Sequence, residues 1–144
     1  MYILKNKLLS LHGQNNGLLT EYFCKIYHNT MLITEVASKI EGRVVCCENK
    51  AAGEVEYAFS SDLMSDVLKV ERENVLLITG LANLQVIRTS EMSDINCIVI
   101  ARNKKLNSEI IKLATENGIV LIESPYSVFR ISGELYNAGI KPLF

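Results

Sequence analysis

Two carboxylates in the stretch SSDLMSDVLK, residues 60–69, have the spacing of a catalytic or metal-binding pair. The apolar positions of this stretch recur at helical spacing, and on a helix Asp62 and Asp66 lie one turn apart on one face. Such a pair suits general acid–base chemistry or Mg²⁺ binding. No third ligand or base is nearby in sequence. We therefore expect a helix capped by Ser60 or Ser61, with Asp62 in its first turn.

The segment ITGLAN, residues 78–83, has the character of a ligand-binding turn. An apolar run ends at Thr79, Gly80 permits a tight turn, and Asn83 is suited to cap a following helix. In parallel α/β sheets, ligands bind at the carboxyl ends of strands, where helix N-termini present free N–H groups to anions. The chain contains neither GxxxxGK[ST] nor GxGxxG, so a simple strand-to-helix turn is the alternative.

Two more predicted strands end in polar side chains. IARNKKLN brings Arg102, Lys104 and Lys105, which form either an anion clamp or a solvated loop. ESPYSVF brings two serines that can cap a helix and a tyrosine that either stacks on a planar ligand or packs at the sheet rim. We expect a nucleotide-like anion at this edge. The candidate ligand-binding residues are Thr79, Gly80, Asn83, Arg102, Ser124 and Tyr126.

The cysteines and histidines do not have the spacing of a metal or redox site. They are Cys24, Cys46, Cys47, Cys97, His12 and His28. Cys46 and Cys47 are adjacent and Cys97 lies within an apolar run, so no CxxC pair exists. We expect reduced thiols in a cytoplasmic protein, with no metal site and no cofactor.

Composition indicates one soluble domain. The chain has 144 residues, of which 49% are hydrophobic and 22% charged, with a formal net charge of −1. A duplex-binding surface needs clustered basic residues, so we expect no nucleic-acid partner. The apolar runs are too short to cross a bilayer, and the N-terminus has no signal-peptide pattern, so we expect no membrane partner.

The elements that position these residues alternate between strand and helix. Residues 1–30 lack a firm period and are expected to be an N-terminal extension. We expect one domain over residues 31–144, which opens with a helix capped by Thr34 and ended by Gly42. Strands are predicted in residues 43–47, 53–59, 74–79, 96–101 and 119–124, and helices in 60–69, 83–92, 106–118 and 125–138. This alternation predicts a three-layer α/β/α sandwich with a largely parallel sheet.

Residues 31–141 resemble the small DRTGG-domain proteins. YAFSSDLMSDVL is similar to a segment of that family, and the later strand ending in Thr, the Asn after it and the closing helix follow in the same order. The matching positions are Ser61, Asp62, Leu63, Ser65, Asp66, Thr79 and Asn83. The Asp-Arg-Thr-Gly-Gly signature is absent, because the corresponding region reads ENKAAGEVEYAF.

The resemblance implies a non-catalytic, regulatory or ligand-sensing domain related to the N-terminal domain of HPr kinase/phosphorylase. Stand-alone copies in anaerobic bacteria are often encoded near hydrogenase genes. It also implies a homo-oligomer, and it makes Ser61, Asp62, Ser65 and Asp66 a helix cap or a domain contact. Two alternatives stay open: a phosphotransfer or kinase-like enzyme, and an iron–sulfur accessory protein that uses Cys46, Cys47 and Cys97.

Overall fold

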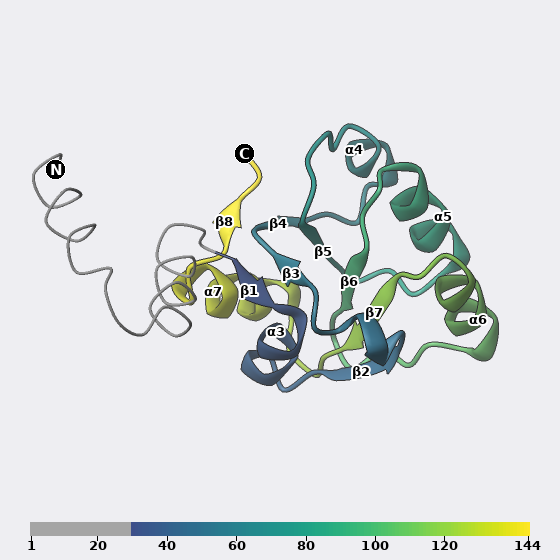
Figure 1. Cartoon of the computed structure of the whole chain (residues 1–144), viewed down its shortest axis with the longest axis horizontal. Helices are drawn as coiled ribbons and strands as arrows, with labels where there is room; N and C mark the ends of the chain where they lie inside the picture. The colour runs from purple at the N-terminus through teal and green to yellow at the C-terminus, as the bar shows by residue number, and fades with distance from the viewer. Residues whose placement is uncertain (1–29) are drawn as a thin grey trace, which may run out of the picture.

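The structure, a computed structural model, describes residues 30–144 (Figure 1). Nearly all of the predicted N-terminal extension, residues 1–30, therefore lies outside the described residues, together with His12, Cys24 and His28. The division of the chain at residue 31 stays a prediction.

Within residues 30–144, one six-stranded sheet has the order β2-β7-β6-β5-β4-β8. The strands are β2 Arg43–Cys46, β4 Tyr57–Ser60, β5 Val75–Thr79, β6 Cys97–Ile100, β7 Val120–Glu123 and β8 Lys141–Pro142. All neighbours pair in parallel except β2, which runs antiparallel to β7. The three central strands β5, β6 and β7 are buried throughout, as expected for strands covered on both faces.

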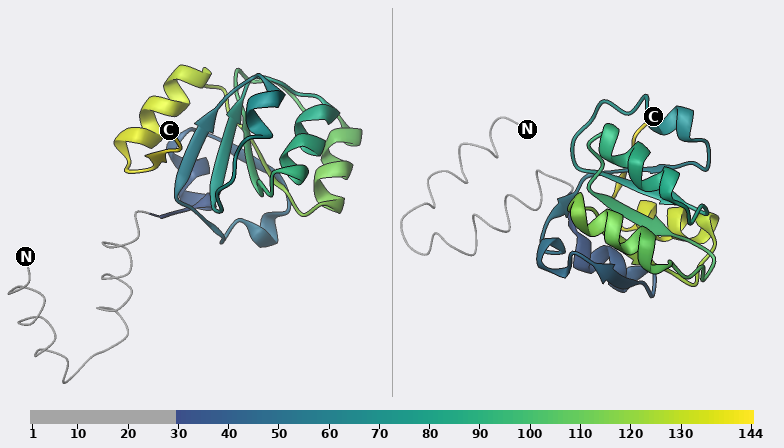
Figure 2. Two further views of the ribbon diagram at one scale, coloured as in Figure 1. Left: turned by 90° about the horizontal axis from the view of Figure 1, so that it is seen from above. Right: turned by 90° about the vertical axis from the view of Figure 1, so that its right-hand side faces the viewer.

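Helices cover both faces of this sheet, so the predicted three-layer sandwich is confirmed (Figure 2). Alternate side chains of each strand point to opposite faces, which gives the domain two cores. On one face Leu76 and Ile78 pack with α3 (Ile33–Lys39) and α7 (Val128–Asn137). On the other face Leu77 packs with α4 (Met64–Val67), α5 (Leu84–Met92) and α6 (Ser108–Glu116).

Side-chain caps fix the starts of the three longer helices. The side chains of Asn83, Asn107 and Ser127 accept hydrogen bonds from the backbone N–H groups three residues later. The Asn83 cap of α5 was predicted, whereas α6 and α7 begin two and three residues after their predicted starts at 106 and 125. The three caps also align the N-termini of α5, α6 and α7 after the carboxyl ends of β5, β6 and β7.

The start of the domain differs from the prediction. Met31–Leu32 form a strand, β1, that pairs antiparallel with β3 (Glu54–Val55), so α3 begins only at Ile33. The proposed Thr34 cap is wrong, because Leu32 is the N-cap and its backbone N–H bonds the Glu35 carboxylate at 3.2 Å. The two-residue pairing with β3 holds the chain extended where the helical pattern begins.

Gly42 ends α3 as predicted, but its small size has a second role. Glu41, not Gly42, adopts a positive φ of 48°, and the Gly42 N–H donates to Ala37 O at 2.8 Å. This is the closing hydrogen bond of a Schellman-type helix end. A Cβ at position 42 would lie 2.5 Å from Ile122 Cγ2, so glycine lets the chain pass close to β7.

The single strand predicted over residues 53–59 is two strands. Val55 belongs to β3 and pairs with Met31, whereas Tyr57 opens β4 in the main sheet. The chain passes from one sheet to the other at Glu56. The alternation of apolar and polar residues continues across this point, so the sequence pattern did not indicate two strands. A short 3₁₀ turn, Glu48–Lys50, precedes β3. No helix in the described part of the chain is long and apolar enough to span a bilayer.

Candidate functional site

Asp62 lies at the carboxyl end of the sheet, between β4 and β5. Its Oδ1 accepts hydrogen bonds from Thr79 Oγ1 and from the Gly80 N–H, both at 2.7 Å. Arg102 Nη2 lies 3.9 Å from the second oxygen, Oδ2. The Thr79 hydrogen bond, helped by Gly80 and Arg102 and opposed by partial burial, holds the pKa of the Asp62 carboxyl below its usual range. An ionised carboxylate therefore occupies the donors of the β5–α5 turn.

This geometry corrects the predicted helix over residues 60–69. The helix α4 begins only at Met64, its N-cap is Leu63, and no side chain caps it. Ser60 is the last residue of β4, and the Ser61 hydroxyl accepts from the Leu63 N–H at 3.0 Å in a local turn. The prediction that Ser60 or Ser61 caps the helix is wrong, since the bond from Asp62 to Thr79 holds the chain extended there.

Asp66 does not join Asp62. It lies in α4 and forms an ion pair with Lys69 at 3.0 Å, whereas Asp62 lies before the helix and turns toward β5. Ser65 is exposed on the outer side of α4. The arrangement of an acid–base or Mg²⁺ pair is therefore not formed.

The loop after β6 reaches back to the same turn. Arg102 Nη2 donates to Gly80 O at 3.1 Å, and Lys104 Nζ donates to the same carbonyl oxygen. Arg102 and Asn103 both adopt positive φ values, 67° and 54°. Their backbone N–H groups donate to Tyr126 O and Ser124 O, at 2.8 and 2.9 Å. The backbone of the next loop thus holds both cations over Gly80.

Gly80 is required here for close approach. A Cβ at this position would lie 2.1 Å from Arg102 Nη2, so any other residue displaces the guanidinium. Thr79, Gly80 and Arg102 are therefore three predicted ligand-contact residues that the fold brings together, and they meet around Asp62, which was predicted to be a capping residue.

The other three predicted ligand-contact residues have structural partners. Asn83 caps α5. Ser124 is buried, and its hydroxyl donates to Ile40 O at 2.7 Å. The ring of Tyr126 has the Arg130 guanidinium over it at 3.5 Å, and a hydrogen bond to Glu41 raises the pKa of its hydroxyl. The fold places these side chains at the same edge but not in the Asp62 cluster.

A second carboxylate at this edge, Glu123, was missed. Its side chain is only 4% exposed, yet Arg43 Nη2 and Lys105 Nζ lie at 3.0 and 3.2 Å from Oε2. The Leu106 N–H donates to Oε1 at 2.9 Å. Burial alone would raise the pKa of Glu123, but these three donors outweigh it and hold the pKa below its usual value.

The two carboxylate clusters are neighbours. Lys104 contacts Gly80 in the first and Lys105 contacts Glu123 in the second. Lys104 and Lys105 were noted in the sequence as cations after a strand. Arg43 carried no such signal, because it joins the edge only through the antiparallel pairing of β2 with β7. Within the described residues, these clusters together hold the cations Arg43, Arg102, Lys104 and Lys105 and the anions Asp62 and Glu123.

The described cysteines are separate from this edge. Cys46, Cys47 and Cys97 are free thiols. Cys97 is the first residue of the central strand β6, where burial raises its pKa well above the usual range. Among residues 30–144, no group of three or more His, Cys, Asp or Glu side chains is close enough to hold a metal ion.

A solved structure with a similar fold contains the CBS and DRTGG domains of the regulatory region of Clostridium perfringens pyrophosphatase, complexed with the activator diadenosine tetraphosphate. The TM-score is 0.59 and the sequence identity is 14%, so the likeness is one of fold. The match covers 74% of this chain and 46% of that one, so the chain spans less than half of that structure. No curated protein sequence matches the chain.

The family relationship agrees with the order of elements described above. The family model of the DRTGG domain matches residues 35–138, from the first turn of α3 to the end of α7. This span includes both carboxylate clusters and the whole sheet except β8. The chain belongs to the DRTGG domain family.

Proposed function

We propose that the chain is a non-catalytic regulatory domain that senses a nucleotide-like anion at the carboxyl edge of its sheet. The observation that carries this proposal is the charge of that edge. In the two carboxylate clusters four cations face two anions, a charge of +2, on a chain whose formal net charge is −1. A concentrated positive charge at an edge of backbone N–H groups favours phosphate.

In the structure, Asp62 occupies the place at this edge that we propose for a phosphate group. Its carboxylate takes the Thr79 hydroxyl and the Gly80 N–H, which are the donors that a phosphate group would use in this turn. Asp62 is about half exposed and lies on a loop, so an incoming anion can displace it at small cost. Exchange of Asp62 for a ligand phosphate would change the conformation of the segment that leads into α4, and this change is the proposed signal.

The relatives support a regulatory role. A DRTGG domain occurs in the regulatory region of the clostridial pyrophosphatase, whose structure holds a dinucleotide activator. We extend this to a nucleotide as the ligand of the present chain. We also propose that the chain is a cytoplasmic bacterial protein related to the N-terminal domain of HPr kinase/phosphorylase. It would be of the hydrogenase-associated, stand-alone type.

Calorimetric titration with ATP, AMP and diadenosine tetraphosphate tests the proposal. We expect Arg102→Ala to weaken binding about tenfold, because it removes a charge-assisted hydrogen bond donor. Arg88→Ala is the matched control, since Arg88 is exposed on α5, away from this edge. Asp62→Asn should strengthen binding several-fold, because the neutral amide competes less well for the Gly80 N–H.

Failure of all three compounds to bind below millimolar concentration would contradict the ligand and favour a protein partner. Exposed apolar side chains such as Phe129, 90% exposed, and Leu63, 58% exposed, are the observation in favour of that second function. We also propose a homo-oligomer, which the mass of the protein in solution tests. A purified sample that absorbs near 400 nm would instead indicate an iron–sulfur protein.

A further inference from the structure

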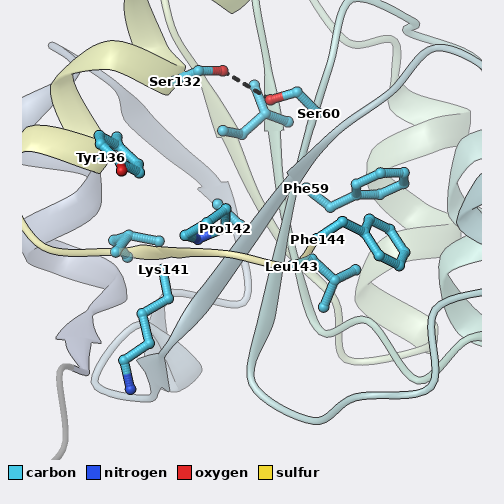
Figure 3. Close-up of a pocket in the computed structure, with 11 residues that line it drawn as sticks. Phe59, Ser60, Ser132, Tyr136, Lys141, Pro142, Leu143 and Phe144 are labelled. Atoms are coloured by element: carbon cyan, nitrogen blue, oxygen red, sulfur yellow. Dashed lines mark hydrogen bonds between the residues drawn. The ribbon is translucent and has the colours of Figure 1, made fainter.

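A pocket of about 400 Å³ lies beside β4, on the side where the sheet ends (Figure 3). Ser132 and Tyr136, one turn apart on α7, line one side of it, and Phe59 and Phe144 pack edge to face on the other, with ring centroids 5.6 Å apart. Its walls are mainly apolar, and Tyr136 remains 66% exposed. The volume lies within the usual range for small-molecule sites, about 300–1,000 Å³.

The backbone of Ser60 presents an open strand edge to this pocket. The pairing of β4 with β8 ends at Ala58 and Pro142, and Leu143 N–H donates the last hydrogen bond, to Ala58 O, at 3.2 Å. Because the Ser61 N–H bonds Ile78 O on β5, the N–H and carbonyl of Ser60 point the opposite way, toward β8. Ser60 lies beyond the paired residues, so this donor and acceptor face the pocket.

The side chains add an acceptor at the same place. Ser132 Oγ donates its single proton to Val128 O at 2.8 Å. The 2.8 Å contact between Ser60 Oγ and Ser132 Oγ is therefore donated by Ser60, which leaves lone pairs on the Ser60 oxygen. One donor and two acceptors, set beside apolar walls, complement a flat ring that carries an amino group next to a ring nitrogen.

We propose that this pocket is the subsite for an amino-substituted heterocycle, the base of the nucleotide-like anion; the inference rests on the proposed function above. Ser60 precedes Asp62 by two residues, and the pocket residue Ile78 precedes Gly80 by two. A ring in the pocket therefore places its phosphates toward Arg102 and Lys104. An added peptide strand fits less well, because within the described strand β4 Ser60 alone extends beyond the pairing with β8 on that side, and a strand needs several such residues.

Calorimetry on the full chain separates the two subsites. The probes are adenosine, inosine, inorganic triphosphate and ATP. Adenosine should bind more tightly than inosine, which lacks the amino group. Tyr136→Ala should weaken the binding of adenosine and of ATP about tenfold, which is the loss of affinity expected for one stacking partner. Phe129→Ala is the matched control, an exposed aromatic residue on the same helix that does not line the pocket. Arg102→Ala should weaken the binding of ATP and leave the binding of adenosine unchanged.

Three results would overturn the inference. If Arg102→Ala weakens the binding of ATP while Tyr136→Ala and Ser132→Ala do not, the anion site is supported and the ring binds elsewhere. If ATP and inorganic triphosphate bind equally tightly, the pocket contributes nothing. If neither ATP nor adenosine binds below millimolar concentration, the inference and the proposed function both fail. Adenosine binding that depends on Tyr136, with ATP binding insensitive to Arg102→Ala, supports the pocket and contradicts the anion site. Thermal melting of each variant checks that the fold is kept.

Discussion

Asp62 and Glu123 are two carboxylates at the same edge of one sheet, and they are held in opposite ways. Glu123 is the last residue of β7, nearly buried, and its oxygens are taken by Arg43, Lys105 and the Leu106 N–H. Asp62 lies on a loop between β4 and α4, half exposed, with its hydrogen bonds on one oxygen only.

The difference indicates which carboxylate holds the fold and which is free to exchange. The Glu123 carboxylate is itself nearly buried and pairs with the exposed cations Arg43 and Lys105. The Asp62 carboxylate, in contrast, is half exposed and accepts from the buried Thr79 and Gly80. Its strand position ties Glu123 to β2 and to the loop before α6, so it joins three segments. Asp62 joins the segment before α4 to the β5–α5 turn, with Arg102 of the loop after β6 at 3.9 Å. We therefore assign stability mainly to the Glu123 cluster and ligand response to the Asp62 cluster.

The largest expected effect is the loss of stability on removing Glu123. Glu123→Ala should lower the free energy of unfolding by about 2–3 kcal/mol, because it removes a nearly buried carboxylate that pairs with Arg43 and Lys105 and accepts from the Leu106 N–H. Asp62→Ala should lower it by about 1 kcal/mol, since the Asp62 carboxylate is half exposed. Urea denaturation of both variants measures the contrast. Equal losses would mean that the two clusters are not distinct in role.

The dependence of stability on low pH should also differ between the Glu123 and Asp62 clusters. The pKa values of both carboxyls lie below their ordinary values, 4.5 for Glu123 and 3.8 for Asp62, so each charged form stabilises the folded state. This contribution is complete above the ordinary pKa and is lost as the pH falls through the lowered value. The free energy of unfolding should therefore fall below about pH 4.5. Glu123→Gln should flatten that decline more than Asp62→Asn; a decline that neither variant changes would contradict the assignment.

The sequence predicted β2, β5, β6 and β7, most helices and the family because these depend on local pattern, whereas β1 and β8 were not predicted and β3 and β4 were predicted as one strand. Continuous apolar runs predicted β5, β6 and β7, and Asn83 was recognisable as a cap. The site was predicted only in part. Thr79, Gly80 and Arg102 follow from the rule that ligands bind at the carboxyl ends of strands.

The misassignments come from contacts between segments distant in sequence. Asp62 has the local context of a helix cap, and only its bond to Thr79, 17 residues later, removes it from the helix. Arg43 and Glu123 are 80 residues apart and meet because β2 adds antiparallel to an otherwise parallel edge. Ser124 and Tyr126 were placed at the correct edge, but their side chains turn to Ile40 and to Arg130 and Glu41.

A smaller effect, on binding alone, should follow from Gly80→Ala. The new Cβ would push the Arg102 guanidinium away without removing its charge, so binding of ATP should weaken about tenfold or less. Gly133→Ala is the matched control, because nothing lies within 4 Å of a Cβ there. That substitution in the middle of α7 should stabilise the fold by about 0.5–1 kcal/mol and leave binding unchanged. Unchanged ATP affinity in Gly80→Ala would show that the position of Arg102 does not matter.

The smallest expected effect concerns Ser61. If Ser61 capped α4, Ser61→Ala would lower the free energy of unfolding by about 1 kcal/mol. The structure gives it only a local turn bond to Leu63, in a region open to water. We therefore expect Ser61→Ala to change stability by less than about 0.5 kcal/mol. Urea denaturation of Ser61→Ala beside Asn83→Ala, which removes a true N-cap, gives the comparison. Equal losses in the two variants would mean that α4 starts at Ser61 after all, and Asp62 would then face the helix N-terminus and not the Gly80 turn.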